Sequence, residues 1–289
     1  MAYIDKPADS AIKPLHNLIM DMCGRTGYTP DSVFEGLLDY IIGYLNPSLT
    51  PQPIEGWKFK PDDTPKFIEM LKAVIECYRT EIPRKGWYDP FGDLYMAIHA
   101  GGNGKGQFFT PSAVATFTAK VTVSNWKESE GQITPFGKRI IINDCAAGSG
   151  RMPLAGYCEL LRIMQEDWGY SPQKAEARRP YLCCEDLDYN CVKMAAINLA
   201  FHGCFGEAVC HDTLTEPDAV RLGYIINETM YPFPTSLPSI RKVDNPSSFV
   251  STRLMLARKR QQEQCKPKAK QVEPIIKKEH KQPQQLELW

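Results

Sequence analysis

The sequence predicts an α/β protein with a doubly wound, Rossmann-like sheet behind a helical N-terminal region. An apolar run at residues 140–142 leads into a glycine-rich turn and then into a stretch compatible with a helix. Two more short apolar runs, at residues 181–185 and 207–210, are separated by another stretch of helical periodicity. Acidic residues follow all three runs. Such positions lie at the carboxyl ends of parallel strands, where these sheets bind ligands.

The first hundred residues have the periodicity of helices. Apolar side chains repeat at helical spacing over residues 12–23, 31–45 and 64–78, and a proline-rich connector at residues 46–65 separates the second and third stretches. No motif in this region carries chemistry by itself. We therefore expect a helical domain, residues 1–88, that packs on the following domain.

A second helix start lies at the end of a glycine-rich loop. Thr110 is suited to be the N-cap and Pro111 the first helical residue, which predicts a helix over residues 112–123. The aromatic side chains just before it, Phe108 and Phe109, either join the core or flank a flat ligand ring.

The central stretch, residues 140–152, reads I-I-I-N-D-C-A-A-G-S-G-R-M. It predicts a buried strand, a loop containing Gly148 and Gly150, and a helix from Met152 to about residue 165. Glycines allow backbone angles and a close approach that a side chain would block, and the free N–H groups of the helix start face the same place. The loop is therefore expected to hold a ligand.

The residues around the loop restrict what that ligand is. A phosphate-binding P-loop requires Lys and then Ser or Thr after its second glycine, where this chain has Arg151 and Met152. A dinucleotide fingerprint requires a third small residue where Pro153 stands. Asp144, four residues before the first glycine, instead suits a cationic ligand. S-adenosylmethionine has both an ammonium group and a thioether chain that can lie against the glycines.

The second half of the sheet region continues in the same way. Residues 190–201 have helical periodicity, and Gly203 is a natural residue to end that helix. A strand-like run at residues 223–226 precedes Asn227. No series of strands is predicted after Pro238.

Charge divides the chain unevenly. The whole sequence of 289 residues has 34 basic and 34 acidic residues, but residues 241–289 contain twelve Lys or Arg against five Asp or Glu. Their content of Lys, Gln and Pro predicts a basic, disordered tail. Such a tail is usually only solvated, and contact with DNA phosphates is the alternative. The predicted domains are thus residues 1–88, 89–240 and 241–289.

The ten cysteines do not form a metal motif. The cluster of Cys183, Cys184, Cys191, Cys204 and Cys210 lacks a C-x-x-C pair, so small buried side chains are favoured over a zinc site, and no metal is expected. The sequence shows no signal peptide and no apolar run near the ~18 residues of a membrane span. We expect a cytoplasmic protein with reduced thiols and no membrane contact.

Four motifs in order resemble the cofactor motifs of N6-adenine DNA methyltransferases. They are Q-F-F-T-P at residues 107–111, D-C-A-A-G-S-G at 144–150, E-D-L-D at 185–188 and H-D-T-L at 211–214. The modification subunit of type I restriction–modification systems is the most similar group, and D-P-F-G-D-L-Y at residues 89–95 also resembles it.

This resemblance implies S-adenosylmethionine as cofactor and DNA as substrate. It implies that Thr110 and its neighbours contact the methionine part, that Asp186 binds the ribose hydroxyls and that Asp212 accepts from the adenine amino group. The full set of implied cofactor-binding residues is Gln107, Phe108, Thr110, Pro111, Asp144, Ala146, Gly148, Gly150, Asp186 and Asp212.

The catalytic motif of that family, Asn or Asp followed by Pro-Pro and Tyr or Phe, has no counterpart here. The chain contains no Pro-Pro pair. Asn227 stands at the expected distance, with Glu228 and Thr229 in place of the prolines and Tyr231 and Phe233 as the aromatic candidates. These three, Asn227, Tyr231 and Phe233, are the predicted catalytic residues.

Two function classes fit the sequence. The first is an S-adenosylmethionine-dependent adenine-specific DNA methyltransferase of a restriction–modification system that acts alone or with a specificity or other partner subunit. The second is a catalytically silent relative that binds the cofactor and acts as a DNA-binding or regulatory subunit. The four cofactor motifs fit both classes, while the missing prolines favour the second class or an enzyme that needs a partner.

Overall fold

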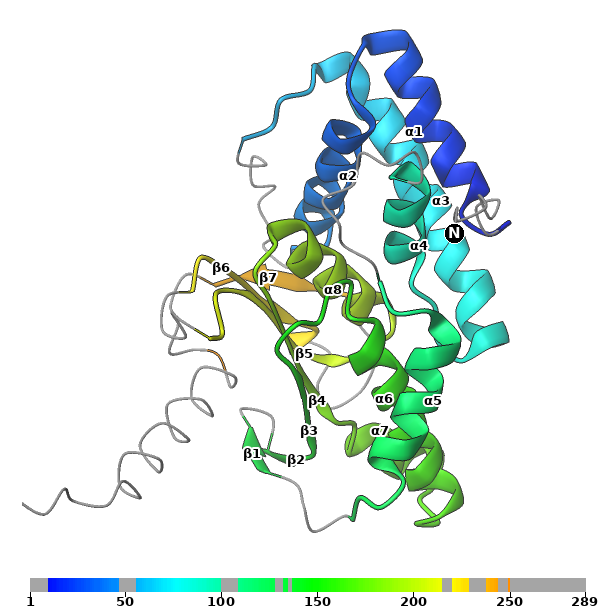
Figure 1. Ribbon diagram of the computed structural model, residues 1–289, viewed down its shortest axis with the longest axis vertical. Coiled ribbons are helices and arrows are strands. Elements are labelled where there is room, and N and C mark those ends of the chain that lie inside the picture. Colours follow the sequence, from blue (N-terminus) through cyan, green and yellow to red (C-terminus); the bar gives the residue numbers. More distant parts are fainter. Residues whose placement is uncertain are drawn as a thin grey trace, which may run out of the picture.

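The computed structural model describes residues 10–46, 56–99, 109–127, 132–134, 137–214, 220–228, 238–243 and 249 (Figure 1). The helices are α1 Lys13–Thr26, α2 Pro30–Tyr44, α3 Thr64–Lys85, α4 Pro90–Ile98, α5 Ser112–Val123, α6 Arg151–Glu166, α7 Pro172–Ala177 and α8 Tyr189–Phe201, with a 3-10 turn at Pro61–Asp63. The strands are β1 Gln132–Thr134, β2 Gly137–Arg139, β3 Ile141–Asp144, β4 Tyr181–Asp186, β5 Phe205–Cys210, β6 Leu222–Ile226 and β7 Ile240–Lys242.

The three helices predicted in the first hundred residues are present as α1, α2 and α3. Helix α3 continues seven residues beyond the predicted end at residue 78, to Lys85, with Pro83 in its last turn. The additional helix α4 was not predicted. Its start has a clear chemical cause, because the Asp89 side chain accepts a hydrogen bond from the Gly92 N–H and Pro90 occupies the first turn.

Five strands form one mixed sheet in the order β3-β4-β5-β6-β7. The pairs β3–β4 and β4–β5 are parallel, whereas β6 is antiparallel to β5 and β7 is antiparallel to β6. A doubly wound sheet would continue after β5 on the other side of β3. The chain instead turns back beside β5, so the doubly wound prediction does not hold for this part of the molecule.

Helices α6 and α8 cover the same face of the sheet. Both connect parallel neighbours in the same direction along the sheet, and right-handed crossovers then place them on one side. The alternation of side chains along each strand agrees, since Leu182, Ala208 and Ile226 join the core beneath these helices, whereas Tyr181 and Phe205 form a separate cluster.

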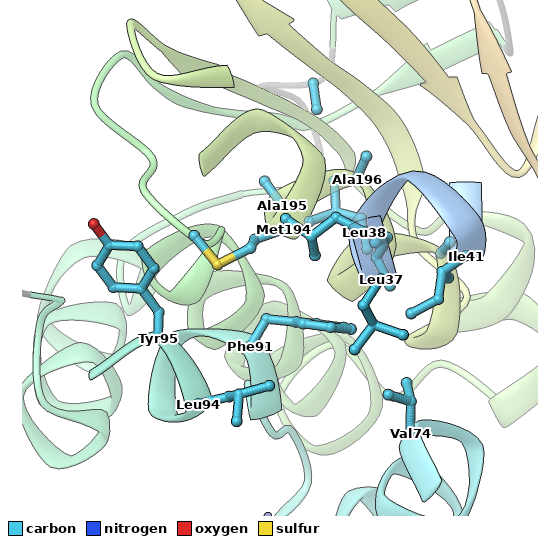
Figure 2. Close-up of a cluster of buried hydrophobic side chains, with 14 of the residues drawn as sticks. Leu37, Leu38, Ile41, Val74, Phe91, Leu94, Tyr95, Met194, Ala195 and Ala196 are labelled. Carbon is cyan, nitrogen blue, oxygen red and sulfur yellow. The ribbon is translucent and has the colours of Figure 1, made fainter. Parts of the chain in front are cut away.

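The core beneath α8 also contains the N-terminal helices. Leucines and isoleucine of α2, Phe91 and Leu94 of α4, and Met194 of α8 converge in one buried cluster (Figure 2). The phenylalanine rings of α2 and α4, Phe34 and Phe91, meet edge to face with centroids 6.4 Å apart. The helical region and the sheet therefore share apolar surface that neither buries alone.

Strand β3 differs from its prediction as a buried strand. It pairs with β4 on one side, and among the described residues it is the edge of the sheet. Its residues are half-buried, with Asn143 exposed. The apolar run identified the strand, but burial depends on a second neighbour that the sequence pattern does not reveal.

Several smaller predictions can be compared with the structure. The predicted polar loops before β3 and β4 contain the hairpin β1–β2 and helix α7. Strand β7 follows Pro238 and crosses the domain boundary predicted after residue 240; the basic tail beyond residue 243 lies outside the described residues except for Phe249. The clustered cysteines are buried as expected: Cys183, Cys184, Cys191, Cys204 and Cys210. None of the described helices is both long and apolar enough to span a membrane.

Candidate functional site

The glycine loop joins β3 to α6 in a conformation that requires its glycines. Gly148 and Gly150 have φ of 55° and 85°, in the left-handed region. A Cβ atom at Gly148 would lie 2.9 Å from the ring of Phe109, and one at Gly150 would lie 3.3 Å from the backbone of Ala195. The loop is therefore closely packed on both sides, and a side chain at either position would force it to move.

The end of β4 holds this loop in place. The Ala147 N–H donates to the carbonyl of Glu185 at 2.9 Å, and the Gly148 N–H donates to the Asp186 carboxylate at 2.8 Å. The other oxygen of Asp186 accepts from the Asp188 N–H at 2.9 Å. Each oxygen of Asp186 keeps a second lone pair for a ligand.

Asp144, at the end of β3, lies at the same edge of the sheet. One of its oxygens accepts from the Ala146 N–H at 3.1 Å. Burial raises the pKa of the Asp144 carboxyl; the Ala146 hydrogen bond opposes this, and the nearby carboxylates of Asp186 and Glu185 add to the increase. A cation beside Asp144 would reverse this effect.

A cavity of about 180 Å³ opens between the loop and the start of α5. Its walls combine one carboxylate, one guanidinium, one hydroxyl, one thiol and several apolar groups: Phe109, Thr110, Ala146, Ala147, Gly148, Arg151, Met152, Asp186 and Cys191. This composition fits S-adenosylmethionine, which offers hydroxyls and an ammonium group to acids and a flat ring and thioether to apolar walls. The residues present therefore suit the cofactor that the resemblance of the motifs implies.

The cavity contains only some of the predicted cofactor residues. Thr110, Ala146, Gly148 and Asp186 line it. Asp144 and Gly150 stand beside it without lining it. Asp212 follows β5 and accepts a hydrogen bond from the Leu214 N–H at 3.0 Å, again outside the lining. The prediction for Gln107 and Phe108 falls on residues that the structure does not describe.

The start of α5 corrects one prediction. Helix α5 begins at Ser112, so Pro111 occupies the N-cap position and Thr110 precedes it. The Pro111 carbonyl accepts the first helical hydrogen bonds, from Val114 and Ala115. Thr110 therefore does not cap the helix; it lines the cavity instead.

Arg151, the first residue of α6, is a site residue that sequence reasoning missed. Its Nε donates to Asp89 at 2.8 Å, its Nη2 to Asp93 at 2.7 Å and its Nη1 to the Thr110 carbonyl at 3.0 Å. Burial alone would lower the pKa of the Arg151 guanidinium, but Asp89 and Asp93 together raise it. Arg151 thus stays charged and links α4, the Thr110 segment and the glycine loop.

Asp89 is the most heavily hydrogen-bonded carboxylate of the site. One oxygen accepts from Gly92 N–H and the Asn198 amide, at 2.8 and 2.7 Å; the other accepts from Ser149 Oγ and Arg151 Nε, at 2.5 and 2.8 Å. Four donors occupy its four lone-pair positions, which makes burial of the charge tolerable.

The same network reaches the N-terminal helices. The Asn198 amide also donates to the Ser149 carbonyl at 2.7 Å, and its oxygen accepts from the hydroxyl of Tyr78 in α3 at 2.5 Å. The loop is thereby connected through α8 to the helical region. Asp89 and Arg151 are 62 positions apart in the chain, so no local sequence pattern could have revealed this ion pair.

Asn227 does not lie where the prediction requires. Because β6 is antiparallel to β5, its carboxyl end lies beside the start of β5, at the edge opposite the cavity. The buried amide donates to the carbonyls of Ala200 and Cys204, at 3.1 and 2.9 Å, and accepts from the Ser239 N–H at 2.9 Å. This placement rules out contact with a base in the cavity. Tyr231 and Phe233 lie outside the described residues.

The sequence model of the N-6 DNA methylase family matches residues 88–239, more than half of the chain. The chain belongs to the N-6 DNA methylase family. No curated protein and no solved structure matches it. The matched region begins just before α4 and includes the glycine loop, the acids of β3 and β4, and the cavity between them. The predicted methyltransferase family is therefore confirmed. Membership implies DNA as substrate and S-adenosylmethionine as the usual methyl donor.

Proposed function

We propose that this member of the N-6 DNA methylase family binds S-adenosylmethionine in the cavity between Thr110 and the glycine loop, for methylation of adenine N6 in DNA. The observation that supports it is the joining of a glycine loop, a cavity and the Asp186 carboxylate at one edge of the sheet. A DNA substrate and the free cysteines of the core are consistent with a cytoplasmic protein.

Different residues of the site are suited to bind different parts of the cofactor. The two oxygens of Asp186 are oriented by backbone N–H groups and can each accept from a ribose hydroxyl. The Asp144 carboxylate can pair with a cationic group of the cofactor. Phe109 and Met152 provide apolar contacts for the ring or thioether. When bound, the cofactor supplies an activated methyl group on a sulfonium.

The groups that position the target adenine must come from outside this set of residues. Methylation of an amino nitrogen needs hydrogen-bond acceptors that position it in line with the methyl group and relieve its growing positive charge. Asn227 cannot provide them from the opposite edge of the sheet. We assign this task to a specificity or other partner subunit, or to residues beyond those that the structure describes.

A second candidate follows from the same observation. If Asn227 is only structural and nothing replaces it, the chain is a cofactor-binding relative without catalysis that serves as a DNA-binding or regulatory subunit. The two candidates share the cofactor site and differ only in methyl transfer.

Calorimetry tests the cofactor site. Gly148→Val should clash with Phe109 and Asp144→Ala should remove the carboxylate, so each should weaken S-adenosylmethionine binding by at least about tenfold, or about 1.4 kcal/mol. Folded variants that bind like wild type would show that the ligand binds elsewhere.

Methyl transfer separates the two candidates. The protein is incubated with methyl-labelled cofactor and mixed DNA, alone and with candidate partner subunits, and the nucleosides are analysed. N6-methyladenine above the Gly148→Val control identifies the enzyme. Cofactor binding without any labelled adenine, with or without partners, identifies the silent relative.

A further inference from the structure

Arg151 holds three segments that meet only at the cavity. Its guanidinium contacts Asp89 and Asp93 at the start of α4, and the Thr110 carbonyl in the cavity wall. The residue itself follows Gly150 directly and begins α6. One side chain therefore fixes the distance between the glycine loop and the wall that faces it.

We propose that Arg151 is a positioning residue for the cofactor pocket, and that α4 is the support it uses. The proposal rests on the proposed function in that the pocket is assigned to S-adenosylmethionine. It goes beyond it by assigning a role to Arg151, Asp89 and Asp93, none of which the sequence motifs for the cofactor include.

Direct binding of the cofactor's carboxylate by Arg151 is the competing role. The charge of the cluster disfavours it, because one guanidinium faces two carboxylates and the sum is negative. All three nitrogens of Arg151 already donate to protein oxygens. An anionic ligand group would meet donors that are already in use and two carboxylates nearby.

The close packing around Gly92 shows how tightly this support is built. A Cβ atom there would lie 2.1 Å from Asp89 Oδ2, 2.7 Å from Arg151 Nη2 and 2.8 Å from Ser149 Oγ. Because Arg151 is 6 % exposed and Asp89 is 2 % exposed, water cannot replace a lost partner easily. A change in the network must move the backbone of the loop or of the Thr110 segment.

The test compares two matched aspartate variants and one arginine variant. Asp93→Asn removes one carboxylate from Arg151. Asp39→Asn removes the partner of Lys193, an ion pair of 2.5 Å between α2 and α8 that does not line the cavity. The two aspartate side chains are 28 % and 31 % exposed, so the chemical change and the solvent screening are alike. Arg151→Lys keeps the charge and loses the forked geometry.

Amide hydrogen exchange on the ligand-free protein is the first measurement. In Arg151→Lys and Asp93→Asn, the glycine-loop amides of Ala147, Gly148 and Gly150 should exchange at least about fivefold faster than in wild type, because local opening becomes easier. Asp39→Asn should leave them within about twofold. Equal acceleration in all three variants would mean a loss of overall stability and would overturn the proposal, as would no acceleration in Arg151→Lys.

Cofactor affinity is the second measurement. Arg151→Lys should weaken both S-adenosylmethionine and methylthioadenosine, which lacks the amino-acid end, by about tenfold each, since the glycine loop and the facing wall contact the part that the two ligands share. A loss for S-adenosylmethionine with methylthioadenosine binding unchanged would indicate that Arg151 binds the carboxylate directly and would overturn the positioning role. If wild type binds neither ligand, the proposed function fails, while the exchange measurement still decides whether Arg151 holds the loop.

Discussion

At the residue scale, the carboxyl group of Asp144 connects cofactor binding to pH. Burial raises its pKa above the ordinary aspartate value, and the carboxylates of Asp186 and Glu185 add to this. Only the ionised form attracts a cation. Affinity for S-adenosylmethionine should therefore fall as the pH is lowered from neutral through this raised pKa.

The comparison with Asp144→Asn isolates this carboxyl. The amide does not titrate, so the variant should bind more weakly at neutral pH and show a flatter dependence over the same range. Calorimetric titrations at several pH values provide both slopes. Parallel slopes for wild type and variant would mean that another group is responsible.

His202, also at the residue scale, connects stability to pH. Its Nδ1 donates to the Asn198 carbonyl at 2.6 Å and its Nε2 accepts from the Tyr88 N–H at 3.1 Å, and this second contact requires the neutral ring. Burial lowers its pKa to about 4, although the Asn198 carbonyl and Asp89 favour the charged form. Below pH ~6.5 the unfolded chain binds the proton first, and stability is lost as the pH falls toward 4.

The size of this loss can be measured by urea unfolding. Because the ring is partly exposed, we expect the free energy of unfolding to fall by between about 1 and 2 kcal/mol from pH 7 to pH 5 on account of His202 alone. His202→Gln should start from a lower stability and lack this part of the slope. The same pH slope in the variant would contradict the assignment.

At the element scale, Asn227 ties the end of β6 to α8. Asn227→Ala removes three buried hydrogen bonds, and it also places alanine at a φ of 56°, which asparagine tolerates better. We expect the free energy of unfolding to fall by about 3 kcal/mol, with cofactor binding unchanged in the folded protein.

A second substitution separates the two causes. Asn227→Gly loses the same hydrogen bonds without the backbone strain, so it should be less destabilising than alanine by about 1 kcal/mol, as measured by urea unfolding. An unchanged stability in both variants, together with a loss of methyl transfer, would instead return Asn227 to the catalytic role.

The elements show which features local sequence determines. Helices α1, α2, α3, α6 and α8 were predicted because apolar spacing along one segment is enough to define them. The glycine loop was predicted because backbone positions with a positive φ favour glycine, and glycines at such spacing are visible in the sequence. The direction of β6 was not, since a five-residue apolar run pairs equally well either way and the choice is made by tertiary packing.

The site residues also differ in whether local sequence reveals them. Asp186 and Gly148 were found by motif order, whereas Arg151 and Asp89 were missed because charged residues far apart in the chain resemble surface residues until the fold pairs them. Asn227 shows the reverse error, in which a plausible spacing pointed to the wrong edge of the sheet.

At the scale of the whole molecule, the shared core determines how the protein unfolds. Phe91 of α4 is fully buried and packs against the rings of Phe34 in α2 and Tyr78 in α3, while Met194 of α8 lies in the same cluster (Figure 2). Residues on both sides of the domain boundary predicted at residue 88 thus stabilise each other. We propose that the helical region and the sheet unfold together.

Phe91→Ala tests this coupling. The cavity left by the ring should lower the free energy of unfolding by about 3 to 5 kcal/mol, while Phe117→Ala, at a ring that is 68 % exposed on α5, should change it by less than about 0.5 kcal/mol. Calorimetry should show one transition in wild type, with calorimetric and van 't Hoff enthalpies equal, and one transition at lower temperature in Phe91→Ala. Two transitions in wild type, of which Phe91→Ala shifts only one, would establish that the helical region folds independently.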